Sequence, residues 1–146
     1  MKHFSAILLV LVALNSYSQE TIDYELIEIT CLNLVDNQKD EYVINSRKEY
    51  FDQMKGLRSK NKECRNQGFS SIDFNTHTLL GFIVKTGGCS EPEYNLKITS
   101  NRSEYNVKCE VSNTGACRRG WTKAFWVTVE KLDTKKPVEF EFITGG

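Results

Sequence analysis

Few side chains in this sequence could act as a catalytic base, and this limits the possible functions. Beyond the first 18 residues the only histidine is His77, with Asp73 four residues before it. A serine or cysteine nucleophile needs a base within hydrogen-bonding reach, so every such scheme must use His77. Residues of short polar turns more often serve backbone hydrogen bonds. We therefore predict no catalytic residue and no enzymatic activity, and keep a small hydrolase using His77 as an alternative.

The cysteines could form either a metal site or disulfides. No C-x-x-C pair occurs, and structural zinc sites need four closely organised ligands, so we expect no metal and no other cofactor. Cys109 alternates with apolar residues and should be a buried thiol. Cys89 and Cys117 end and begin strands that we expect to be neighbours, which predicts a disulfide between them. Because the count of five is odd, at least one thiol stays unpaired; Cys64 either pairs with Cys31 or is free.

The first 18 residues have the form of a secretory signal peptide. A basic start is followed by nine apolar residues, Ala6–Leu14, and by Ser16 and Ser18 at the minus-three and minus-one positions of a cleavage site. Nine residues are too few for a membrane-spanning helix, which needs about 20. We expect residues 1–18 to be removed and the remainder to be periplasmic or extracellular, without an integral membrane span. Disulfides persist in such oxidising compartments.

Length and charge further limit the number of domains and the kinds of partner. Residues 19–146 have the size of a single globular domain. The whole chain has 19 basic and 19 acidic residues, and the predicted signal peptide contains only one of them, Lys2. Nucleic acids and acidic membranes normally require a basic surface. We therefore expect no nucleic-acid partner.

Period-two alternation predicts a mainly antiparallel β protein. The expected strands are Thr21–Leu32, Glu41–Asn45, Ser71–Phe74, Leu79–Lys85, Tyr94–Thr99, Tyr105–Val111, Trp121–Glu130 and Val138–Phe142. The first two strands are expected to pair as a hairpin, and so are the fifth and sixth. Regular strand spacing with one helix indicates an α+β fold, either sandwich-like or a partly closed barrel.

One helix is predicted after the second strand. Ser46-Arg47-Lys48-Glu49 has the spacing of a capping box. The apolar residues that follow form one helical stripe, which should pack on the sheet: Tyr50, Phe51, Met54 and Leu57.

The stretch from Leu79 to Ser90 should contain the central strand and its exit. Residues on both faces are apolar, so we expect cover on two sides. Gly81 in the middle of the strand predicts a bulge or an unusually close neighbour. Gly87-Gly88 lacks the lysine and helix of a phosphate-binding loop and predicts a tight turn or bulge with positive φ.

Arg118-Arg119-Gly120-Trp121 is the most suggestive surface segment. Arginine and tryptophan are enriched among the residues that dominate protein interfaces. We therefore take Arg118, Arg119 and Trp121 as candidate contact residues for another exported protein. Trp121 could instead be a core residue at the start of its strand. A protease inhibitor presenting the Cys117 loop is a second alternative function.

Several segments together resemble a known family. Ile72-Asp73-Phe74 leads to Leu79-Leu80-Gly81; then come Gly87-Gly88-Cys89-Ser90, Glu91-Pro92-Glu93-Tyr94, Gly115-Ala116-Cys117 and Val129-Glu130-Lys131-Leu132. With the signal peptide these look like a small exported protein of Bacteroidetes type. The part from Leu79 to Phe142 resembles the C-terminal domain of the PrcB-like protease-complex-subunit family, although it differs in its cysteine pair and lacks an obvious lipid-attachment cysteine. The resemblance implies an accessory, non-catalytic subunit of an extracytoplasmic protease and carries over no catalytic residue.

Overall fold

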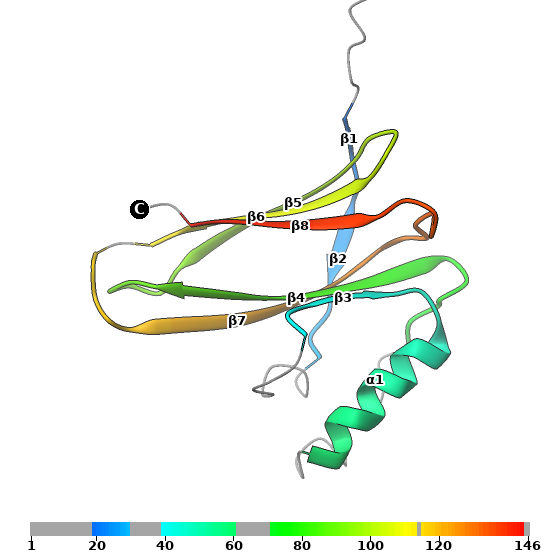
Figure 1. Cartoon of the computed structure of the whole chain (residues 1–146), viewed down its shortest axis with the longest axis horizontal. Helices are drawn as coiled ribbons and strands as arrows, with labels where there is room; N and C mark the ends of the chain where they lie inside the picture. Colours follow the sequence, from blue (N-terminus) through cyan, green and yellow to red (C-terminus); the bar gives the residue numbers. More distant parts are fainter. Residues whose placement is uncertain (1–18, 30–38, 61–70, 114, 145–146) are drawn as a thin grey trace, which may run out of the picture.

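The protein forms two stacked β-sheets with a helix outside one of them (Figure 1). The structure is a computed structural model that describes residues 19–29, 39–60, 71–113 and 115–144. Its elements in chain order are β1 (Glu20–Thr21), β2 (Tyr24–Leu26), β3 (Glu41–Ile44), α1 (Arg47–Lys60), β4 (His77–Gly87), β5 (Glu93–Ser100), β6 (Tyr105–Ser112), β7 (Gly120–Glu130) and β8 (Val138–Thr144).

Each sheet has four strands among the described residues. One has the order β1-β5-β6-β8 and the other the order β2-β7-β4-β3. All neighbouring strands are antiparallel except β6 and β8, which run parallel. The sheets are stacked as an open sandwich, so the sandwich-like alternative is the one observed.

The main core lies between the two sheets. The inward face of β4 supplies Leu80, Phe82 and Val84, each at most 1 % exposed. They meet apolar residues of β6 and β7, and the ring of Phe82 stacks on that of Phe125 with centroids 5.1 Å apart. Cys109 is part of this core and fully buried, as its alternating position predicts.

The opposite face of β4 is also covered, which confirms the expected two-sided burial. Leu79 belongs to a second cluster with residues of β3, β7 and α1. Gly81 lies directly across from Trp126 in a continuous register, without a bulge. A Cβ on Gly81 would come within 2.6 Å of Cε3 of the Trp126 ring, and two other ring carbons would be closer still. The glycine is therefore explained by the close approach of the indole ring.

A buried hydroxyl links β4 to two neighbouring segments. The side chain of Thr78 is fully buried. Its hydroxyl donates to Asn45 Oδ1 at 2.8 Å and accepts the backbone N–H of Leu132 at 3.1 Å. Both bonds are needed because a buried polar group without a partner destabilises the fold.

The helix begins as predicted. The Ser46 hydroxyl accepts the N–H of Glu49 at 3.2 Å, and the Glu49 carboxylate accepts the N–H of Asn45 at 2.8 Å. Tyr50 is buried in the second cluster, with its ring centroid 5.6 Å from that of Phe74. Of the expected stripe, Phe51 is half-buried, while the side chains of Met54 and Leu57 lie outside the described part.

Two predicted elements differ from the structure. The first two strands do not pair with each other, because β2 pairs with β7 and β3 pairs with β4. Residues 71–74 are not a strand, since Asp73 Oδ1 accepts the N–H of Asn75 at 3.0 Å and the Asp73 carbonyl accepts that of His77 at 2.9 Å. Such local bonds to an aspartate favour a turn over a ladder. The hairpin of β5 and β6 is confirmed.

Candidate functional site

The candidate site is the end of the sandwich where β4 stops and β7 starts. Gly87 and Gly120 are the last cross-strand pair of the two strands. Just beyond them Cys89 and Cys117 form a disulfide, with their Cα atoms 4.8 Å apart, so the predicted pairing is confirmed. We call this region, residues 87–89 with Asn113 and residues 115–121, the disulfide end.

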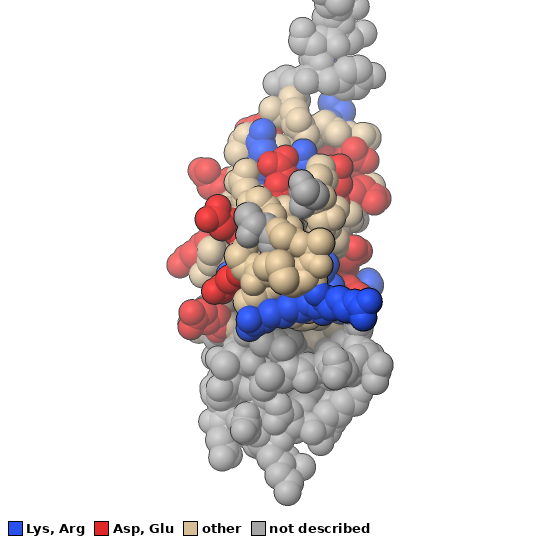
Figure 2. Space-filling view, turned by 90° about the vertical axis from the view of Figure 1, so that its left-hand side faces the viewer, with Lys and Arg blue, Asp and Glu red and all other residues tan. Residues whose placement is uncertain are grey.

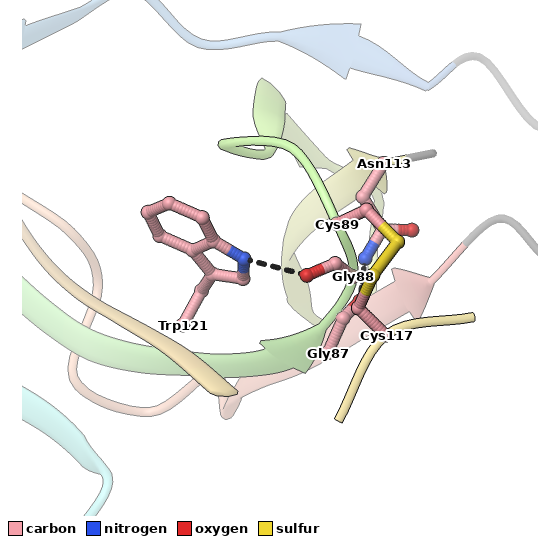
Figure 3. The surroundings of a disulfide bond; sticks show 6 residues. All are labelled: Gly87, Gly88, Cys89, Asn113, Cys117 and Trp121. Carbon is pink, nitrogen blue, oxygen red and sulfur yellow. Dashed lines mark hydrogen bonds between the residues drawn. A yellow bond between two sulfur atoms is a disulfide. The ribbon is translucent and has the colours of Figure 1, made fainter. Parts of the chain in front are cut away.

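Hydrogen bonds hold both sides of the disulfide end together (Figure 3). The Gly88 N–H donates to the Arg119 carbonyl at 3.1 Å, and the indole N–H of Trp121 donates to the Gly88 carbonyl at 3.2 Å. The amide of Asn113 donates to the Gly87 carbonyl and, at 3.1 Å, to the Thr86 hydroxyl. Sequence reasoning missed Asn113, because an asparagine in a polar loop carries no local sign of a distant partner.

The glycines of this region act differently from the prediction. Positive φ occurs at Gly115, with φ of 81°, and not at Gly87 or Gly88. Gly88 is buried, and a Cβ there would lie 2.7 Å from Nδ2 of Asn113. The predicted tight turn or bulge with positive φ at Gly87-Gly88 is therefore wrong, since the need for glycine at position 88 comes from the packed asparagine.

The three predicted contact residues lie together at this end. Arg118 and Arg119 are exposed and Trp121 is half-buried. The Arg119 guanidinium carbon lies 4.1 Å from the Trp121 ring centroid, which is within the range of a cation–π contact. With its indole N–H bonded to Gly88, the tryptophan is both partly exposed and held in one orientation. It is thus neither a fully buried core residue nor a freely rotating surface side chain.

Positive charge gathers on one side of this end. Between Cys117 and Phe125 the chain has the three bases Arg118, Arg119 and Lys123 and no acid. Figure 2 looks at this end of the molecule and shows a band of Lys and Arg below an uncharged area, with Asp and Glu at the sides and a mixture of both signs above. The arrangement suits a partner surface that combines acidic and apolar groups.

His77 lies at the other end of β4, well away from the disulfide end. It is half-buried, and its Nδ1 lies 2.8 Å from the Thr76 hydroxyl, which also donates to the Asp73 carboxylate at 3.1 Å. In a hydrolytic triad the imidazole lies between the hydroxyl and the carboxylate. Here the hydroxyl lies between the other two groups. The N–H of Asn75 and the hydroxyl of Thr76 lower the pKa of Asp73, as is typical of a turn-forming aspartate.

The three cysteines outside the disulfide are Cys31, Cys64 and Cys109. Burial raises the pKa of the Cys109 thiol, which is free. Cys31 and Cys64 lie outside the described residues. Within the part of the chain that the structure describes, no three His, Cys, Asp or Glu side chains are grouped so that they could hold a metal ion.

In the described ranges no helix has the length and apolar character needed to cross a bilayer. A disulfide is typical of proteins outside the cytoplasm. Comparison of the chain with family models, with curated proteins and with solved structures found no match.

Proposed function

We propose that this chain is an exported, non-catalytic accessory protein that binds another exported protein through its disulfide end. The observation that carries the proposal is the oriented Trp121, half-exposed between the Gly88 carbonyl and the Arg119 guanidinium. A side chain held in its bound orientation loses little conformational freedom on association. Arginine and tryptophan side chains often contribute most of the binding energy of an interface.

The resemblance to the PrcB-like family supports an extracytoplasmic protease as the partner. An accessory subunit of that kind would bind the protease and leave its active site open. The Cys89–Cys117 bridge and the bond from the Gly88 N–H to the Arg119 carbonyl serve this role because they tie the segment of the contact residues to the end of β4.

A protease inhibitor is the second candidate, and one observation favours it. Residues 115–120 are exposed and tied to the sandwich by the Cys89–Cys117 bridge. A short exposed loop held by a disulfide could enter a protease cleft in a fixed conformation. An inhibitor would block the protease, whereas an accessory subunit would co-purify with it and leave it active.

The test uses the partner recovered with the tagged protein from its own envelope fraction. The double variant Arg118→Ala/Arg119→Ala should weaken the purified complex by about tenfold or more, measured as Kd. Arg102→Ala is the matched control, since Arg102 is an exposed arginine in the turn between β5 and β6. Equal affinity of both variants and the unmodified protein would refute the proposed contact surface. Protease activity in the same complex separates the accessory from the inhibitory role.

A further inference from the structure

Strand β8 is the last strand of its sheet, and one of its two sides is unpaired within the described part of the chain. Its seven residues pair with β6 along their whole length, in a parallel register without a bulge. In the sheet order β1-β5-β6-β8 no described strand lies on the other side of β8. An edge of this kind presents backbone N–H and C=O groups that another chain can bond.

The pairing with β6 identifies the backbone groups that face the open side. The Tyr105 N–H donates to the Pro137 carbonyl at 2.9 Å, and the register sets Tyr105 beside Val138. Because backbone groups alternate in direction along a strand, the odd-numbered residues of β8 direct theirs to β6. The even-numbered residues direct theirs to the open side, where no described residue bonds them: Val138, Phe140, Phe142 and Thr144.

Two of these residues turn aromatic side chains towards the other sheet. The rings of Phe140 and Phe142 pack on Phe82 of β4, with centroids 5.9 and 5.7 Å from that of Phe82. Both side chains contact the main core but are only half-buried. A strand added beside β8 would cover their exposed parts. Backbone bonding and apolar burial would then act together, which is the combination that strand addition uses.

Sheet edges often carry features that prevent pairing, such as a proline, a bulge or a charge that points into the core. Within residues 138–144, all of which the structure describes, none of these occurs, and Pro137 lies before the strand. The opposite edge of the sandwich is covered, because the chain crosses there from β1 to β2 and the Tyr24 hydroxyl donates to the Leu96 carbonyl of β5 at 3.2 Å. The edge of β8 is therefore the better candidate for strand addition.

The charges on the outer face of this edge indicate which segment would fit. Glu139 and Glu141 of β8 are both exposed there. Lys108 of β6 lies beside Glu141 in the register, but its ammonium group forms an ion pair with Glu110 at 2.8 Å. Lys97 lies on β5, two strands away from the edge. The carboxylates beside the open side are therefore in excess, and a segment with basic side chains complements them.

The same acids disfavour a second copy of this chain as the partner. Antiparallel pairing of two β8 strands would bring Glu139 and Glu141 close to the same residues of the copy, and like charges across a strand pair are destabilising. A third acid lies on the inner side, since Glu41 pairs with Phe82 and shares its face. The edge thus fits a basic segment better than self-association.

We infer that the open edge of β8 binds an extended segment of another exported protein, in which basic and apolar residues alternate. The segment adds as a strand beside β8 and bonds to the backbone groups of Phe140 and Phe142. Its basic side chains lie beside Glu139 and Glu141, and its apolar side chains cover the two phenylalanine rings, because successive side chains alternate between faces. The inference rests on the proposed function in taking an exported protein as the partner, and it adds a second surface outside the disulfide end.

Residue-specific hydrogen exchange tests this with a blocked heptapeptide of alternating valine and lysine. In the free protein the amides of Phe140 and Phe142 should exchange fast, while the amide of Glu141, bonded to β6, should be protected. Adding the peptide should slow exchange at Phe140 and Phe142 by about tenfold or more. The double variant Glu139→Lys/Glu141→Lys should abolish this protection, and Glu139→Asp/Glu141→Asp should retain it. A peptide with glutamate in place of lysine is the matched control and should have no effect.

Three results would overturn the inference: unchanged exchange at Phe140 and Phe142 with millimolar peptide, equal protection by the glutamate peptide, or protection in the free protein that rises with its concentration. The last result would assign the edge to a second copy of this chain. Failure here is separable from failure of the proposed function, because the Arg118→Ala/Arg119→Ala test uses the whole partner and leaves β8 intact.

Discussion

Replacing Gly81 with alanine should lower the free energy of unfolding strongly. The sign of this change tests whether the Trp126 ring is the reason for the glycine. In the middle of a strand, alanine is normally favoured over glycine by about 0.5–1 kcal/mol, because glycine loses more backbone entropy on folding. On that ground alone Gly81→Ala would be stabilising. The structure predicts the opposite, since the new methyl group would lie 2.6 Å or less from three carbons of the Trp126 ring.

The size of the effect follows from how tightly the indole ring is held. To reach an ordinary contact the ring or the strand must shift by about 1 Å, and overpacking a well-packed core costs about 1–3 kcal/mol. Trp126 is 4 % exposed and its ring centroid is 5.4 Å from that of Tyr42. With little room to move, we expect the upper end of that range, a loss of about 3 kcal/mol in the free energy of unfolding.

Urea unfolding followed by circular dichroism measures this loss. Two further experiments, a control variant and a second background, isolate its cause. Gly120→Ala is the control, because a Cβ there meets nothing within 4 Å; it should be neutral or slightly stabilising. In a Trp126→Leu background, Gly81→Ala should lose most of its effect, since the ring is gone. An unchanged or increased stability of Gly81→Ala, or an equal loss in the Trp126→Leu background, would refute the explanation.

Three further predictions concern buried or cross-linking groups. Thr78→Val should lower the free energy of unfolding by about 1–3 kcal/mol, because it leaves two hydrogen-bonding partners unsatisfied. The control Thr128→Val should change that free energy little, since Thr128 is buried but its side chain has no hydrogen bond in the described structure; equal losses of the two variants in urea unfolding would contradict the prediction. Replacing Cys89 and Cys117 by serine should remove about 3–4 kcal/mol, as the loop-entropy relation gives for a separation of 28 residues, and a melting temperature equal to that of the intact protein would argue against it. Since burial raises the pKa of Cys109, its thiol stays protonated at pH 8 and should resist iodoacetamide until the protein is unfolded; peptide mass spectrometry showing rapid labelling of the native protein at this residue would count against that burial.

The main elements of the fold follow from local sequence patterns. Alternation predicts the long strands because one face of each must be buried, and the capping box predicts the helix start because its polar groups satisfy neighbouring backbone N–H groups. The hairpin of β5 and β6 is predictable for the same reason, since its turn bonds are local. The Cys89–Cys117 bridge needed only the correct strand neighbours.

Long-range packing determines the strand pairing and side-chain contacts that local patterns do not reveal. Strands β1 and β2 are short pieces in different sheets, and their partners β5 and β7 lie far along the chain, so no local pattern reveals that pairing. The sequence by itself determined a mainly β chain with one capped helix, the bridge and the position of Arg118 and Arg119 beside it. Only the tertiary structure placed Trp126 over Gly81 and oriented Trp121 through Gly88, because each of these depends on which distant backbone lies alongside.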